Sequence, residues 1–138
     1  MVGMIRTNTK ISNFFTFKEA TKTDTGLENE PNNNEAISII YTACRMDLVR
    51  QVLNVPVIVN SWFRSKKVNE AVNGATLSQH RQGMAVDFRT NSLTPKQIIA
   101  KIKESGISYD QLIEYNTFVH ISFVVVDSER RQYINKTK

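Results

Sequence analysis

The feature that most constrains the fold of this chain is one long helix, predicted because apolar residues recur with helical spacing across residues 34–54. Asn34 is the expected cap, and the helix should end near Asn54. The apolar stripe consists of Ile37, Ile40, Tyr41, Cys44, Leu48 and Val52. We predict that this is the main core helix and that the stripe is its buried face.

The other elements are expected to be short. Strands are predicted at residues 55–60, 84–88, 110–114 and 118–126, from their β-branched and apolar content. A short helix should follow Ser65 and end at Gly74, and another should run from Thr94 to Gly106. This order lacks the regular alternation of a parallel-sheet fold, so we expect an α+β fold with a mainly antiparallel sheet flanked by helices.

The length of 138 residues and the hydrophobic content of 41% are typical of one domain, residues 1–138. Residues 1–33 are polar and predict a largely irregular N-terminal arm, docked by Phe14, Phe15 and Phe17. No apolar stretch reaches the roughly 20 residues that a membrane-spanning helix needs. No secretory signal is recognisable in the first 17 residues, so we expect cytoplasmic synthesis and no membrane insertion.

The single cysteine and the charge narrow the function classes. Cys44 has no partner for an internal disulfide and is expected to be a buried packing residue of the long helix. The net charge of +5 favours an acidic partner. Lys and Arg are dispersed and do not alternate with aromatic residues as in ribonucleoprotein motifs, so no nucleic-acid partner is expected.

The only two histidines predict a metal site together with one aspartate. His80 precedes Asp87 by seven residues, and the small residues Gly83 and Ala85 allow the chain to turn back so that both side chains reach one metal. His120 lies in a predicted strand. Two imidazoles and one carboxylate are a catalytic Zn²⁺ set, which leaves a fourth position for the water that serves as nucleophile.

These ligands belong to longer motifs. The segment from Ser78 to Asp87 has the pattern Ser-x-His-x-x-Gly-x-Ala-x-Asp, residues 61–65 are Ser-Trp-Phe-Arg-Ser, and residues 109–113 are Tyr-Asp-Gln-Leu-Ile. In these segments, between about residues 14 and 123, the chain resembles the zinc D-Ala-D-Ala carboxypeptidases and related peptidoglycan endopeptidases. The resemblance implies a zinc metallopeptidase with a zinc D-Ala-D-Ala carboxypeptidase or hedgehog-like fold.

The same resemblance implies that Arg64 grips a carboxylate or carbonyl of the substrate, with Ser78 beside it. A guanidinium suits this role because it places two parallel hydrogen bonds on a carboxylate. A surface ion pair for Arg64 and a turn cap for Ser78 are the alternatives.

The general base is the point at which the chain departs from the family. Many relatives have an acidic residue three positions before the last histidine, where this chain has Thr117. A three-residue turn would pair Glu114 with Phe118 and place Glu114 on the face of His120, so we predict Glu114 as the base. A two-residue turn would point Glu114 away, which leaves Asp110 as the second candidate.

The sequence therefore predicts a monomeric zinc peptidase that hydrolyses an amide bond in peptidoglycan stem peptides or cross-links, as a carboxypeptidase or an endopeptidase. By analogy with phage-encoded lytic enzymes (endolysins), it would act at the cell wall after release or be carried in a phage particle. The alternative is a noncatalytic zinc-containing structural or wall-binding module, such as a virion component, because Thr117 occupies the expected acidic position.

Overall fold

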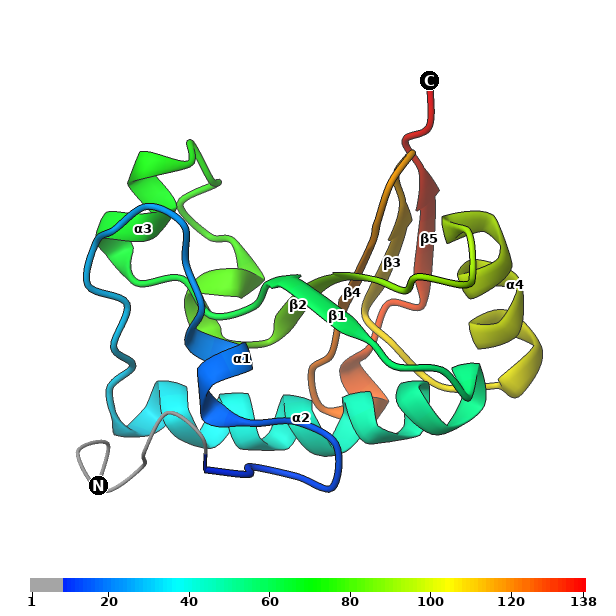
Figure 1. Cartoon of the computed structure of the whole chain (residues 1–138), viewed down its shortest axis with the longest axis horizontal. Coiled ribbons are helices and arrows are strands. Elements are labelled where there is room, and N and C mark those ends of the chain that lie inside the picture. Colours follow the sequence, from blue (N-terminus) through cyan, green and yellow to red (C-terminus); the bar gives the residue numbers. More distant parts are fainter. Residues whose placement is uncertain (1–8) are drawn as a thin grey trace.

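The computed structural model describes residues 9–138, in which a five-stranded sheet is packed against helices (Figure 1). The strands are β1 (Ile58–Ser61), β2 (Ala85–Arg89), β3 (Gln111–Glu114), β4 (Val119–Ser122) and β5 (Gln132–Asn135). Their order is β1-β2-β4-β3-β5, and every neighbouring pair is antiparallel except β3 and β5. The predicted α+β class with a mainly antiparallel sheet is confirmed.

The strands are shorter than their apolar segments suggest. β1 begins at Ile58 rather than at residue 55, and β4 ends at Ser122 rather than at residue 126. β5 was not predicted, because it has only two apolar residues, Tyr133 and Ile134, and is defined by its non-local pairing with β3. After β4 the chain forms the short 3₁₀ helix η3 (Val126–Ser128) and returns beside β3.

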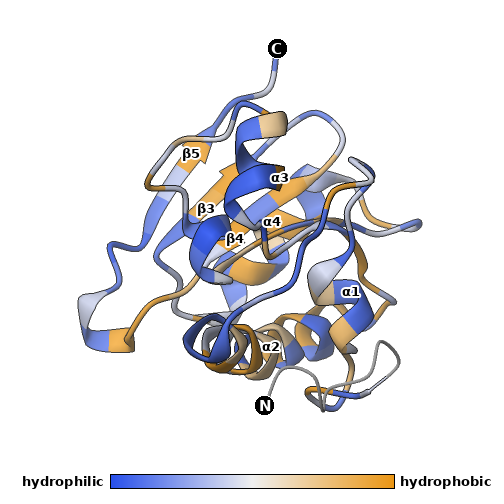
Figure 2. Cartoon of the chain, turned by 90° about the vertical axis from the view of Figure 1, so that its left-hand side faces the viewer, coloured by the Kyte–Doolittle hydropathy of each residue, from blue (hydrophilic) through white to orange (hydrophobic). Residues whose placement is uncertain are grey.

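The long helix is α2 (Asn33–Leu53), but its predicted buried face is wrong. The side chains that reach the core include Ile39, Ala43, Met46 and Val49, whereas Ile37 is 59% exposed. Apolar residues lie on both sides of α2 (Figure 2), so helical spacing did not single out the inner face.

Two details at α2 also differ from the prediction. Cys44 is exposed, so its assignment as a buried packing residue is wrong. The helix cap is Asn32 rather than Asn34, and Asn32 forms a capping box with Glu35. The predicted end of the helix is confirmed, because Asn54 is its left-handed C-cap.

The N-terminal arm is more regular than predicted, although residues 1–8 lie outside the described part of the chain. Its helix α1 (Phe17–Thr21) begins with a capping box between Thr16 and Glu19. Phe15 is buried edge-on against Trp62, and Phe17 is also buried, whereas Phe14 is exposed. Docking through two of the three phenylalanines is therefore confirmed.

Two other helices follow their sequence signals closely. α4 (Pro95–Ser105) is capped by Thr94 and ends at Gly106, as predicted. α3 (Lys66–Ala71) is capped by Ser65, but the left-handed residue after it is Asn73 rather than Gly74. Gly74 is needed for a different reason, because the Asn69 side chain occupies the space that a Cβ atom would fill.

The two faces of the sheet have different roles. Buried apolar side chains form the core face against α2 and α4; they are Val59, Val86, Phe88, Leu112, Val119 and Ile121. Strand alternation places Asp87, Ile113 and His120 on the other face. A register shift in β1 opposes Ser61 to Asp87, which brings Ser61 to that face as well. No helix among residues 9–138 is long and apolar enough to span a bilayer.

Gly83 offers a test of how tightly the turn before β2 is packed on α2. Its φ is +75°, and a Cβ atom would lie 2.6 Å from Cγ1 of the buried Ile39. Gly83→Ala should lower the free energy of unfolding by about 2 to 5 kcal/mol, from left-handed strain plus overpacking. Gly106 has the same φ in open space, so Gly106→Ala should cost only about 1 to 2 kcal/mol. Equal losses in urea unfolding would contradict the packing role of Gly83.

Candidate metal centre

Three side chains from separate segments converge on one point. His80 lies in the 3₁₀ helix η2 (Gln79–Gln82), Asp87 in β2, and His120 in β4, directly opposite Asp87. Oδ1 of Asp87 is 2.8 Å from Nδ1 of His120, and Oδ2 of Asp87 is 3.3 Å from Nε2 of His80. One donor atom from each residue lies within 4.8 Å of the others. The structure thus brings together the three predicted ligands.

The His80 ring is held by the backbone of a neighbouring segment. Its Nδ1 lies 2.6 Å from the carbonyl oxygen of Trp62 and donates a hydrogen bond to it, which leaves Nε2 as the ring nitrogen that faces Asp87. A backbone carbonyl that holds one ring nitrogen in this way orients the other nitrogen toward a metal. Trp62 is itself fixed, since its Nε1 donates to the carbonyl of Gly83 at 3.0 Å.

The electrostatics of Asp87 favour a metal ligand. Burial raises the pKa of its carboxyl, but hydrogen bonds and charge from His120 and His80 outweigh burial and hold this pKa well below its ordinary value. The carboxylate is therefore ionised at neutral pH. Two imidazoles and an ionised carboxylate within reach of one another match the donor set of zinc.

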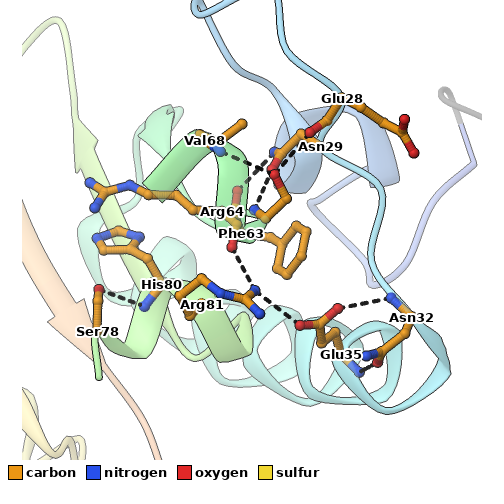
Figure 3. Close-up of polar contacts among 11 residues, drawn as sticks. Glu28, Asn29, Asn32, Glu35, Phe63, Arg64, Val68, Ser78, His80 and Arg81 are labelled. Carbon is orange, nitrogen blue, oxygen red and sulfur yellow. Dashed lines mark hydrogen bonds and ion pairs between the residues drawn. The ribbon is translucent and has the colours of Figure 1, made fainter. Parts of the chain in front are cut away.

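Arg64 lies beside this cluster. Its Nη2 is 3.6 Å from Oδ2 of Asp87, its Nε donates to Oγ of Ser61 at 3.2 Å, and its Nη1 donates to Oδ1 of Asn69 at 3.4 Å. The side chains of Arg64 and His80 extend in the same direction in Figure 3. These contacts fix the guanidinium at the edge of the centre rather than in a surface ion pair.

The backbone that carries Arg64 is tied to the metal turn. Arg64 N–H donates to the carbonyl of His80 at 2.9 Å, and Nη1 of Arg81 donates both to the carbonyl of Arg64 and to Glu35 (Figure 3). Ser78, the other predicted substrate contact, caps η2 by accepting a hydrogen bond from His80 N–H. The observed contact of Ser78 is thus the turn cap.

The predicted register that made Glu114 the base is wrong. Glu114 pairs with Val119 and Ile113 pairs with His120, because the hairpin closes through two residues, with Tyr115 N–H donating to the carbonyl of Phe118. Glu114 therefore points to the face opposite His120. There it is buried and accepts a hydrogen bond from the hydroxyl of Tyr133 at 2.6 Å.

Asp110, the second candidate, is also engaged elsewhere. Arg130 binds its carboxylate through Nε and Nη2, and Gln79 donates to it at 2.9 Å. Hydrogen bonds from Arg130 are the main cause that lowers the pKa of Asp110 to about 2. Neither predicted carboxylate thus reaches the three ligands.

Sequence reasoning missed two contributors to this face. The Trp62 carbonyl is a backbone atom and carries no sequence signal. Tyr115 lies on the face of His120, its ring stacked on Phe118 at 4.5 Å, and burial followed by the charge of Asp87 raises its pKa. Alternation from His120 through a two-residue turn would have found Tyr115.

The sheet, the His-Asp-His cluster and the adjacent arginine together form a candidate metal centre. A family model described as Peptidase M15 matches residues 13–122, and the chain belongs to this family, that of the zinc D-Ala-D-Ala carboxypeptidases. As a member of this family, the chain falls in the class of zinc-dependent metallopeptidases. No curated protein matches the chain significantly.

Glu114→Gln tests the corrected register. The substitution weakens the bond from Tyr133 and should lower the free energy of unfolding by about 1 kcal/mol. Turnover should stay within about twofold of wild type, whereas loss of a general base costs roughly 10²-fold. The measurement is kcat on one peptide substrate, with variant and wild type at equal zinc content. A hundredfold loss of kcat in Glu114→Gln with zinc retained would show that Glu114 takes part in the reaction.

Proposed function

We propose that this chain hydrolyses an amide bond in the stem peptides or cross-links of peptidoglycan, with zinc held by His80, Asp87 and His120. The observation that carries the proposal is the convergence of these three side chains beside the fixed guanidinium of Arg64. Bound zinc would polarise the scissile carbonyl and lower the pKa of a water ligand. The net charge of +5 supports enrichment on anionic wall polymers.

The residues of the chain supply binding and orientation. Arg64 would place two hydrogen bonds on a terminal carboxylate or on a carbonyl of the stem peptide. Ser61 and Asn69 hold the guanidinium before substrate arrives, which lowers the ordering cost of binding. Asp87 stays ionised, and the Trp62 carbonyl accepts the hydrogen bond from Nδ1 of His80, so that Nε2 is the ring atom directed to the metal position.

The positions of the Glu114 and Asp110 carboxylates favour a second candidate function. Since Glu114 and Asp110 are both engaged away from the ligands, a noncatalytic zinc-containing module that binds the wall is the competing proposal. In either case we infer a monomer that acts at the cell wall, after release from the cell or as part of a phage particle.

Metal content tests the centre. Wild type should bind about one zinc per chain, and His80→Ala or His120→Ala should each nearly abolish binding, because two protein ligands rarely hold zinc tightly. Asp127→Asn, which alters an exposed carboxylate of η3, should bind zinc as wild type does. Full zinc stoichiometry in both histidine variants, by metal analysis after dialysis, would refute the ligand set.

Digestion of purified peptidoglycan and soluble stem peptides separates the two candidates. The zinc-loaded peptidase should release products whose masses identify the bond that is cut. A chain that binds zinc and wall fragments but cuts neither substrate would support the noncatalytic module.

Arg64→Lys tests substrate recognition. Lysine keeps the charge but loses the planar two-pronged contact, so kcat/KM should fall about tenfold or more at unchanged zinc content. Arg89→Lys is the matched control, because Arg89 is exposed and its guanidinium donates to a loop asparagine, Asn91. An unchanged kcat/KM for Arg64→Lys would remove Arg64 from substrate binding.

A further inference from the structure

Asp110 is a buried carboxylate with an unusually complete set of partners. It is 3% exposed, and Arg130 donates to it from the backbone N–H at 2.9 Å and from the guanidinium Nε and Nη2 at 3.0 and 2.5 Å. Nε2 of Gln79 donates to Oδ2 of the same carboxylate at 2.9 Å. Asp110 therefore joins two segments that are far apart in sequence.

The first of these segments carries a metal ligand. Gln79 is the residue immediately before His80 and the first residue of η2. Its backbone carbonyl also accepts a hydrogen bond from Met84 N–H at 3.0 Å. The side chain of Gln79 thus connects the turn that presents His80 to the start of β3.

The second segment lies beyond the part of the chain that the family model matches. That match ends at residue 122, and Arg130 stands between η3 and β5. The segment is held in place on both sides of Arg130, since Arg131 N–H donates to the carbonyl of Tyr109 and Gln132 N–H to that of Asp110. The Arg130 side chain is 55% exposed, so its position depends on Asp110 rather than on burial.

We propose that Arg130, Asp110 and Gln79 form a clamp that positions His80 for zinc. The clamp rests on the proposed zinc site and assigns a role in metal affinity to the segment after the matched region. Arg130 orders the Asp110 carboxylate, Asp110 orders the Gln79 amide, and Gln79 fixes the turn from which the His80 ring projects. All three act as positioning residues.

Gln79→Ala separates this role from a merely structural one. It removes the link to η2 but leaves the pair of Asp110 and Arg130 intact, so the unfolding temperature of the metal-free chain should fall by no more than about 5 °C. The dissociation constant for zinc, from competition with a chromophoric chelator, should rise about tenfold or more, as for other supports of metal ligands. Gln82→Ala, an exposed position of the same turn, is the control and should leave zinc affinity unchanged.

Arg130→Ala tests the outer end of the clamp. It should also weaken zinc binding about tenfold, because the Asp110 carboxylate loses the group that orients it. Arg131→Ala is its neighbouring control, since Arg131 contacts Tyr109 through its backbone and not the Asp110 side chain.

Wild-type zinc affinity in folded Gln79→Ala would overturn the clamp, even if Arg130→Ala were unstable. An equal loss of zinc affinity in Gln82→Ala would also overturn the clamp, because any substitution in the turn would then weaken zinc binding. A wild-type chain that binds no zinc would refute the proposed zinc site itself and this inference with it.

Discussion

The pairing of Asp87 with His120 across β2 and β4 is the interaction on which the rest of the site depends. It places an ionised carboxylate at the centre of the sheet, where burial alone would favour the neutral form. Hydrogen bonds and charge from the two imidazoles outweigh that cost, the Arg64 guanidinium lies 3.6 Å from the same carboxylate, and the three groups come from different segments. Packing elsewhere keeps those segments in place: Phe15 packs on Trp62, and the Trp62 carbonyl holds His80.

The sequence predicted elements well where a local signal exists and poorly where the choice was made by packing. Thr94 and Gly106 bound α4 as expected, since caps act within one turn. The buried face of α2 was missed because Ile37 and Ile39 are equally apolar, and only the sheet decides which one is covered. β5 was missed because its pairing with β3 is non-local.

The same distinction applies to the site. His80 and Asp87 could be predicted as partners because one short segment holds both. The contact of Arg130 with Asp110 could not, since a surface-like arginine 20 residues away has no distinguishing pattern. Glu114 was misassigned because the face of every residue in a hairpin depends on the length of its turn, and a difference of one residue reverses them all.

The face to which Glu114 points cannot be changed without disrupting the core. To bring Glu114 to the metal face, β3 would have to slip by one residue against β4, which would also turn the buried Leu112 away from Val86 and Ile121 and the core. The β3–β4 register that sets Ile113 opposite His120 therefore also turns Glu114 toward Tyr133 and brings Tyr115 to the face of the ligands. Positioning the metal ligands and positioning a group for proton transfer are separate structural requirements. The β2–β4 pairing brings Asp87 and His120 together, and the β3–β4 hairpin directs the Glu114 carboxylate away from them, so any proton transfer would fall to another group.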